Sequence, residues 1–316
     1  MSHNITNKDS IAYAGEVPWH GIGKKVSDVM TASEALISGG LDWDVIPNPI
    51  YNAEGKVISG FKAITRKDTG DVFYVSGERY TPIQNRDCFK LFDEVVGTGL
   101  AKYEVVGSLK EGRKVWILSR LPYDFSVKGK DEVNSYLLLT TSHDGSLSLQ
   151  MFETPVRVVC QNTLSASLSG RERGKVAYFK HTINYQSRIG QAQEILASTK
   201  VYYDNFKIAS EALANKQFTS LQIDSFLNNL FEVEDASKVS GKTKSAIEEV
   251  KRLAEEGRGN DIEGIRGTAW AVYNGVTEYV DYERATRGSD DNRLASSWFG
   301  SGGALRERAF ELLLTK

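Results

Sequence analysis

The chain has 316 residues, of which 41% are hydrophobic and 25% are charged, a composition typical of a folded globular protein. Its formal net charge of −2 argues against indiscriminate binding to nucleic acid, which a strongly basic domain would favour. No apolar run approaches the roughly 20 residues of a membrane helix, no signal peptide opens the chain, and the only two cysteines, Cys88 and Cys160, fit a reducing compartment, so we expect a cytoplasmic protein without a membrane span.

The first third of the chain predicts a helix, three strands and a second helix. Thr31 begins a short amphipathic helix that Gly39 and Gly40 end. A helical pattern returns at residues 85–97. Between the helices lie three strand-like runs joined by glycine-containing turns, at residues 43–51, 57–66 and 72–80. Because two prolines make the first run an edge strand, we expect an antiparallel meander between two helices.

Two further hairpins are predicted, with strands at residues 103–109, 114–121, 136–142 and 146–152. The first hairpin turns at Gly112, and its apolar second strand is predicted to be buried on both faces. The second hairpin turns at His143-Asp144-Gly145, where Asp-Gly supplies the positive φ of a tight turn. We expect the polar segment 123–133 between the hairpins to be an exposed loop.

A change from strand to helix is predicted at residues 154–168. Pro155 fixes an extended backbone, whereas Leu164 and Leu168 are spaced as on one helical face. Unpaired N–H groups at a helix start favour an anion such as phosphate, and the segment supplies polar side chains, namely Arg157, Gln161, Asn162, Thr163, Ser165 and Ser167. Two interpretations stay open: a surface that binds phosphate, or a helix cap made by Asn162 or Thr163.

From residue 186 the sequence is helical. One long helix is predicted to about Asn215, and a capping box at Thr219 begins the next. A polar linker at residues 232–243 precedes helices at residues 245–256, at 268–282 and near the C-terminus. We therefore expect an α+β fold, with a core domain of antiparallel meanders and hairpins packed with helices at residues 1–185 and a helical region at residues 186–316.

Basic residues concentrate in the middle of the chain. Between Arg157 and Lys200 there are seven basic and two acidic residues, a local excess of five. This segment is a candidate surface for a polyanion. An ordinary solvated face is the alternative, and it stays equally open.

Four motifs resemble those of a phage- and plasmid-associated family, the domain of unknown function 932. They are PWHGIG at residues 18–23, YTPIQN at 80–85, TPVRVVCQNTL at 154–164 and SSWFGSGGALRERAFELL at 296–313. Together they span nearly the whole chain. The resemblance implies a protein carried by mobile genetic elements, and it implies no established activity.

The order of helix, three-stranded meander and helix is similar to the core of the single-strand annealing recombinases related to Rad52, which phages also carry. This likeness rests on the order of the elements and on no sequence motif. It implies oligomeric rings or filaments that bind single-stranded DNA in a basic groove. It also implies that annealing needs no metal, nucleotide or other cofactor.

The residues give little sign of an enzyme. The sequence has neither a Walker A motif nor a G-x-G-x-x-G motif, and no metal-ligand spacing relates its four histidines, His3, His20, His143 and His181. His143-Asp144 next to Ser146 is better explained as a hairpin tip than as part of a catalytic triad. Two pairs of carboxylates could hold magnesium, Asp42/Asp44 and Asp290/Asp291, although charged residues at loop tips are the commoner explanation.

The leading hypothesis is therefore a non-catalytic protein that binds and anneals single-stranded DNA as a homo-oligomer. The alternative is a protein-interaction module, an inhibitor or adaptor in phage–host conflict, and a metal-dependent nuclease comes third. The candidate DNA-binding residues are cations for phosphates, aromatic faces for bases and polar groups at the predicted helix start: Lys62, Arg66, Arg113, Arg157, Gln161, Asn162, Arg171, Arg173, Lys175, Tyr178, Phe179 and Lys180.

Overall fold

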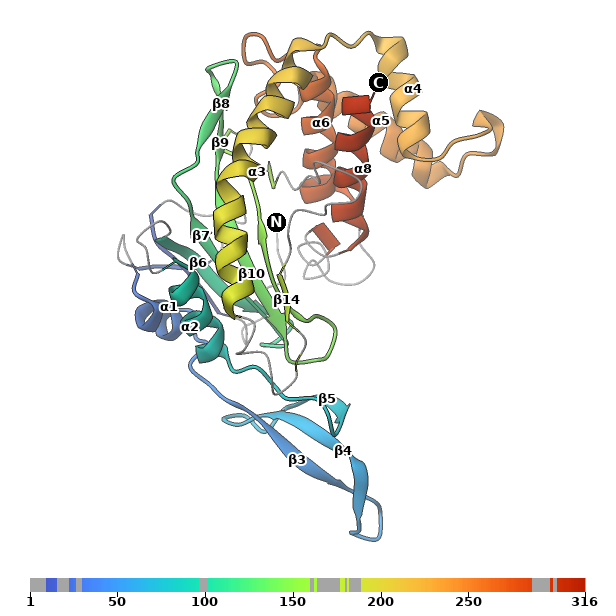
Figure 1. The fold of residues 1–316 in the computed structure, drawn as a ribbon. Helices are drawn as coiled ribbons and strands as arrows, with labels where there is room; N and C mark the ends of the chain where they lie inside the picture. The colour runs from blue at the N-terminus through green and yellow to red at the C-terminus, as the bar shows by residue number, and fades with distance from the viewer. Residues whose placement is uncertain are drawn as a thin grey trace.

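The computed structural model describes residues 10–15, 23–26, 30–96, 102–159, 162–163, 177–179, 181, 189–285, 296–297 and 300–315. These residues form three β-sheets and a set of helices, most of which lie in the C-terminal part of the chain (Figure 1). The predicted α+β class with antiparallel sheets is confirmed. No described helix has both the length and the apolar character that a membrane crossing requires.

The largest sheet has seven strands in the order β14-β11-β10-β7-β6-β1-β2. Its strands are β1 (Ile11–Tyr13), β2 (Lys24–Lys25), β6 (Lys102–Leu109), β7 (Lys114–Arg120), β10 (Tyr136–Ser142), β11 (Leu149–Glu153) and β14 (Ala177–Phe179). All neighbours are antiparallel except β1 and β2. Both predicted hairpins are confirmed. Nearly every residue of β7 is buried, as its apolar run predicts, and every residue of β10 is buried too.

The second sheet is the predicted meander, in the order β3-β4-β5. Its strands are β3 (Val45–Tyr51), β4 (Val57–Arg66) and β5 (Val72–Gly77), and we call this sheet the arm because it projects away from the rest of the molecule (Figure 1). The flanking helices α1 (Ala32–Ser38) and α2 (Asn85–Val96) are also confirmed. Thr31 caps α1 in a capping box with Glu34, so the predicted start is correct.

The third sheet corrects two predictions. It contains β8 (Phe125–Val127), β9 (Asp131–Asn134), β12 (Val156–Arg157) and β13 (Asn162–Thr163), in the order β13-β12-β9-β8. Residues 123–133 are therefore not an exposed loop, because they include a hairpin that buries Val127 and Val133 completely. Asn162 and Thr163 are likewise strand residues that pair with β12, and not residues of a helix. Residues 164–168 lie outside the described part of the chain.

The C-terminal helices are α3 (Ile189–Asn215), α4 (Ser220–Leu230), α5 (Gly241–Glu256), α6 (Ala269–Glu278) and α8 (Ser301–Thr315), with a short 3-10 helix at Ala236–Lys238. A π-helical turn, Tyr279–Glu283, extends α6. The capping box at Thr219 is confirmed. The predicted start of the third C-terminal helix is wrong by four residues, because the Ser240 hydroxyl accepts from the Thr243 N–H and caps α5 earlier.

One hydrophobic core joins the sheets to the helices. Tyr203 and Phe206 of α3 belong to the same buried cluster as Leu137 of the seven-stranded sheet and Phe310 of α8. Trp270 and Tyr273 on α6 are also fully buried, so these aromatic residues belong to the core. The domain boundary predicted near residue 185 stays a prediction. The helix α3 contacts elements that precede this position in the chain and elements that follow it.

Candidate functional site

The candidate site lies where the arm meets the seven-stranded sheet, and we call this region the arm end. It comprises the β6–β7 turn with Lys114, the β10–β11 turn at residues 143–148, and residues 80–85 between the arm and α2. The β6–β7 turn is seated against the arm. Gly112, at its tip, has a φ of 88°, and a Cβ there would lie 3.0 Å from the ring of Trp43, so a larger residue would be strained and crowded.

Gln84 and Asn85, the last residues of the YTPIQN motif, fasten the arm to the body. The amide of Gln84 accepts from the Val45 N–H at 2.9 Å and donates to the Val45 carbonyl at 2.8 Å. It therefore takes the place of a neighbouring strand at the start of β3. Asn85, which is buried, donates to the carbonyl of Leu41 at 2.9 Å and accepts from Nε2 of His143 at 2.8 Å.

Two buried histidines complete this joint. His143 packs edge-on against Trp43, with ring centroids 5.3 Å apart, and stacks on Phe73 at 6.1 Å. His181 stacks on Tyr80 at 4.9 Å. Burial lowers the pKa of His143 to about 3 and that of His181 to about 4. Both imidazoles are therefore neutral at neutral pH, and they form part of an aromatic wall.

Arg66 and Arg113, two of the predicted DNA-binding residues, lie on this wall. The guanidinium of Arg66 is 4.4 Å from the centroid of Trp43, and that of Arg113 is 5.2 Å from the centroid of Phe73. Arg66 also forms an ion pair with Asp68 at 2.8 Å. No carboxylate pairs with Arg113 within the described part of the chain, where its guanidinium makes one long hydrogen bond of 3.4 Å to a backbone carbonyl.

Lys62 lies on the same face of β4 as Arg66, four residues earlier. Its Nζ donates to the carbonyl of Glu78 at 2.9 Å, and within the described residues no carboxylate pairs with it. The structure therefore brings three predicted cations, Lys62, Arg66 and Arg113, to the arm and its base.

Lys114, the first residue of β7, differs from the other cations because only 8% of it is exposed. Even so, neither a carboxylate nor a hydrogen-bond acceptor contacts its Nζ in the described part of the chain. Burial lowers its pKa, the nearby charge of Asp144 opposes that shift and the charge of Lys110 adds to it. Its Nζ is not among the fully buried side-chain atoms that lack a hydrogen-bond partner, and a bound anion would give this ammonium group the counter-charge that the described residues do not supply.

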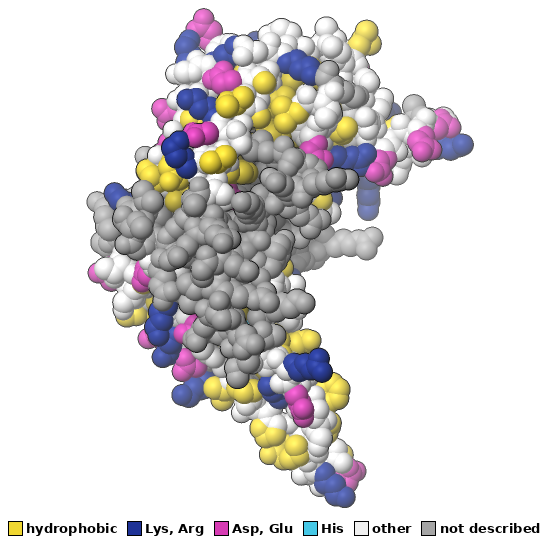
Figure 2. All heavy atoms as spheres, viewed as in Figure 1, with side chains coloured by type: hydrophobic (Ala, Val, Ile, Leu, Met, Phe, Trp, Pro, Cys, Tyr) yellow, Lys and Arg dark blue, Asp and Glu magenta, His cyan; other side chains and the backbone are white. Residues whose placement is uncertain are grey.

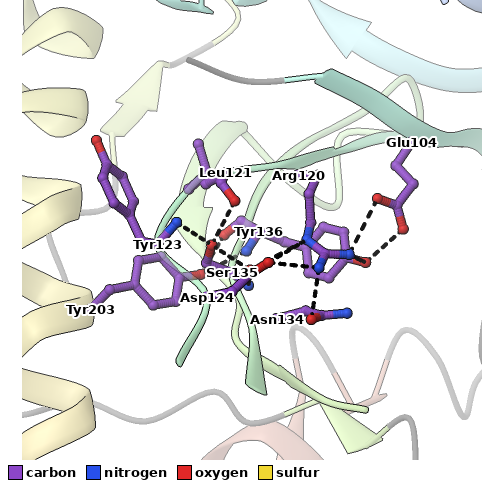
Figure 3. A network of polar contacts seen from close by, with 9 residues as sticks. All are labelled: Glu104, Arg120, Leu121, Tyr123, Asp124, Asn134, Ser135, Tyr136 and Tyr203. Carbon is purple, nitrogen blue, oxygen red and sulfur yellow. Dashed lines mark hydrogen bonds and ion pairs between the residues drawn. The ribbon is translucent and has the colours of Figure 1, made fainter. Parts of the chain in front are cut away.

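Arg120, at the opposite end of β7, has a complete set of partners (Figure 3). It donates to Asp124 and Asn134 at 2.7 Å and to the hydroxyl of Tyr136 at 3.2 Å, and it lies 3.8 Å from Glu104. Tyr136 donates to Glu104 at 2.6 Å. Each nitrogen of the guanidinium thus has a partner, and the network links β6, β7, β9 and β10.

The same network reaches α3. The hydroxyl of Tyr203 donates to the carbonyl of Tyr136 at 2.7 Å and accepts from its N–H at 2.9 Å (Figure 3). This buried hydroxyl therefore bonds to both backbone groups of one residue and fixes the long helix against the sheet, while the carbonyl of Tyr136 also accepts from the Thr154 N–H at 2.9 Å.

Arg157 is removed from the predicted DNA-binding surface because its side chain is fully buried. It forms an ion pair with Asp131 at 2.8 Å and donates to the carbonyls of Arg258 and Gly259, each at 2.9 Å. Trp270 donates to the same carboxylate at 2.8 Å. Arg157 therefore links the third sheet to the α5–α6 connection.

Most of the other predicted site residues lie outside the described part of the chain, namely Gln161, Arg171, Arg173, Lys175 and Lys180. Asn162 is in β13, and Tyr178 and Phe179 are in β14, where Phe179 pairs with Leu149 next to the arm end. Of these three, the backbone alone is described. β14 and His181, which flank Lys180 in the sequence, both lie at the arm end.

Two functional candidates, Lys110 and Lys114, were missed by the sequence-based prediction. The signal was present, because a lysine directly before the apolar run Val115–Leu118 is forced towards the interior by its neighbours. The lack of a partner, however, depends on segments far away in the sequence, which the local pattern does not contain.

The described residues contain no group of three or more His, Cys, Asp or Glu side chains that could hold a metal ion. Asp44, from one predicted carboxylate pair, forms an ion pair with Arg86 at 2.6 Å, and Asp290 and Asp291 lie outside the described residues. The hairpin-tip interpretation of His143-Asp144-Gly145 is confirmed, since Gly145 has a φ of 71° and Asp144 accepts from the Ser146 N–H at 3.0 Å.

A family model with the description "Domain of unknown function (DUF932)" matches residues 72–298, more than two thirds of the chain. The match includes β5, the arm end and the buried Arg157 ion pair. No curated protein and no solved structure matches. The comparisons therefore give the likeness to Rad52-related recombinases no support.

Proposed function

We propose, for a chain that belongs to the domain of unknown function 932 (DUF932) family, that the arm end binds single-stranded DNA and that the protein anneals complementary strands. One observation carries the proposal: Lys110, Arg113 and Lys114 lie within five residues, and none has a carboxylate partner among the residues described. Lys114 is also nearly buried. Phosphate groups are anions that would pair with all three cations.

Aromatic rings beside these cations support a single strand over a duplex. The ring of Tyr74 packs against the β10–β11 turn, since a Cβ at Gly145 would lie 2.9 Å from it. Tyr74 is 40% exposed. Phe61, further along the arm, is 55% exposed. Unpaired bases stack on such faces with a gain of roughly 1–3 kcal/mol each, whereas the bases of a duplex are already stacked.

The proposed location, assembly and remaining DNA contacts are taken from the sequence analysis. The net charge of −2 fits a protein whose DNA contacts are confined to one region. We propose that it acts in the cytoplasm as a ring or filament of identical subunits, without a catalytic centre or a cofactor. The cations Arg171, Arg173, Lys175 and Lys180 stay candidates for the same DNA track.

A salt series of mobility shifts with a labelled single-stranded oligonucleotide tests the binding. The variant Lys110→Gln/Arg113→Gln/Lys114→Gln removes up to three phosphate contacts, so the slope of log affinity against log salt should flatten by about two units. The matched control is Lys238→Gln/Lys242→Gln/Lys244→Gln, which removes the same charge from exposed positions near the start of α5. It should bind as the wild type does.

Two results would overturn this proposal: a wild type that binds no single-stranded DNA, or an arm-end variant with the affinity and the salt slope of the control. Annealing needs a separate assay, in which a fluorophore and a quencher on complementary strands report pairing without added nucleotide. Binding without a faster rate of pairing would restrict the function to DNA binding.

Docking of another protein is the second candidate function, and the apolar surface of the arm favours it. A protein partner that contacts the arm would not require Lys114. Binding that resists salt and survives the arm-end substitutions would therefore favour this alternative.

A further inference from the structure

The cations of the described surface form no continuous basic track in the view of Figure 2, where Lys and Arg side chains are interspersed with Asp and Glu side chains. A bound nucleic acid would therefore depend on a few local contacts. The arm end supplies Lys110, Arg113 and Lys114 from one hairpin. Closeness in the sequence does not bring these side chains together, because successive residues of a strand point to opposite faces of a sheet.

Lys114 lies on the face of the seven-stranded sheet that the arm does not contact. It pairs with Leu109 across the β6–β7 hairpin, and paired residues point to the same side. Leu109 belongs to the buried cluster of Trp116, which is separate from the buried cluster that contains Phe73 of the arm. The stem of Lys114 therefore runs along the face opposite the arm.

Arg113 lies on the other face, where the arm packs. Its carbonyl accepts from the His143 N–H at 2.8 Å, which continues the ladder of β7 and β10 by one pair beyond Lys114 and Ser142. The ring of His143 stacks on Phe73, and the guanidinium of Arg113 is 5.2 Å from the centroid of Phe73. The hairpin therefore presents Arg113 and Lys114 on opposite sides of the sheet.

Lys110 belongs with Lys114. It directly follows Leu109, the residue that pairs with Lys114. Burial lowers the pKa of Lys114, and the charge of Lys110 lowers it further, against the opposing charge of Asp144. The Asp144 carboxylate accepts from the Ser146 N–H at 3.0 Å, and no carboxylate of the described residues forms an ion pair with either lysine. Two like charges are therefore held near each other without a counter-ion between them.

The backbone of Lys110 is a second observation that points to a ligand. Its φ of 56° lies in the left-handed region, which residues other than glycine, asparagine and aspartate rarely adopt. The other described residues of this kind are Glu111, Lys128 and Glu232. Lys128 donates to Asn215 of α3. Glu232 forms an ion pair with Arg308 of α8. Lys110 has the same unfavourable backbone, and its ammonium group has no partner among the residues described.

We infer that Lys110 and Lys114 hold one phosphate of the single strand between them, and that Arg113 contacts a different phosphate on the arm side of the sheet. The inference rests on the proposed DNA binding and adds to it which cations share a phosphate. A phosphodiester group has two oxygens that share its negative charge, so it can accept from both ammonium groups and offset their repulsion.

Double-mutant cycles with the labelled oligonucleotide test the inference. Lys110→Gln, Arg113→Gln and Lys114→Gln each remove one positive charge. Residues that share a partner do not act additively, whereas residues with separate partners do. The effect of Lys110→Gln/Lys114→Gln on affinity should therefore differ from the product of the single effects by at least about threefold. The matched pair, Lys110→Gln/Arg113→Gln, should agree with that product within about twofold.

A second measurement separates the charge of Lys110 from its backbone. Asparagine tolerates the left-handed region, so Lys110→Asn should raise the melting temperature by about 2 °C. It should also weaken DNA binding as much as Lys110→Gln does. Lys110→Arg keeps the charge and should change neither quantity.

Two cycles that behave alike overturn the inference, and so does a Lys110→Asn protein that melts no higher than the wild type. The proposed DNA binding stands in either case, provided that the single substitutions weaken it. A wild type that binds no single-stranded DNA, or single substitutions that all leave the affinity unchanged, would overturn both the inference and the proposed function.

Discussion

The cations at the two ends of the seven-stranded sheet differ in their partners. At the end away from the arm, Arg120 has a partner for each nitrogen, and so does Arg157 in the adjoining third sheet. At the arm end, Lys114 has no partner among the described residues, and Nδ1 of His143 has none there either. The paired cations hold the fold, whereas a cation without a described counter-charge marks where an anion would contribute most.

The largest effect should come from breaking the buried ion pair. Arg157→Ala leaves the Asp131 carboxylate buried and uncompensated, so the free energy of unfolding should fall by about 3–5 kcal/mol. The control is Lys200→Ala, which breaks the ion pair between the exposed side chains of Lys200 and Asp204 and should leave the free energy of unfolding nearly unchanged. Guanidinium chloride unfolding measures both. Equal losses would contradict the difference that we draw between the two regions.

Removal of one hydroxyl should have the next largest effect. Tyr203→Phe removes the hydroxyl that accepts from the Tyr136 N–H, while the carbonyl of Tyr136 keeps the Thr154 N–H, so the cost should be roughly 1–3 kcal/mol. Tyr51→Phe makes the same chemical change on the exposed arm and should cost almost nothing. Thermal unfolding monitored by circular dichroism compares them, and a neutral Tyr203→Phe variant would argue against a structural role for the network.

The joint should lose stability in mild acid. The pKa values of His143 and His181 in the folded protein, about 3 and about 4, lie below the ordinary value, so the unfolded chain binds protons first as the pH falls. Their contribution to stability is therefore complete above about pH 6.5 and declines below it, by roughly 1–1.5 kcal/mol per pH unit for each histidine.

Denaturant unfolding between about pH 7 and pH 5, above the range in which most carboxylates titrate, measures that slope. His181→Phe keeps an aromatic ring beside Tyr80 and should remove about half of it. A flat profile for the wild type over this range would mean that the histidines are not buried in the neutral form.

Much of the fold follows from local patterns. The hairpin around Gly145 and the helix starts at Thr31 and Thr219 depend on turn residues and caps within a few positions, and all three are confirmed. The β8–β9 hairpin escaped prediction because its strands are short and polar. Its burial depends on contacts with α3 and with Arg157, which are distant in the sequence.

The site was less predictable, for the same reason. Arg66 and Arg113 lie in one region because the arm packs against the β6–β7 turn. The spacing of residues in the sequence does not predict this packing. The burial of Arg157 depends on Asp131 and on a connection about a hundred residues later. A cation in a polar motif therefore looks the same in the sequence whether it faces solvent or closes a buried ion pair.

One paired measurement on Lys114 tests the central claim most directly. Lys114→Met keeps the length of the side chain and removes a charge that has no partner among the described residues, so stability should change little. Affinity for single-stranded DNA should fall about tenfold, the effect of one charged contact of roughly 1.5 kcal/mol. Lys207→Met, at an exposed position on α3, should change neither quantity. A Lys114→Met protein that is less stable than the wild type, or that binds the oligonucleotide equally well, would contradict the account.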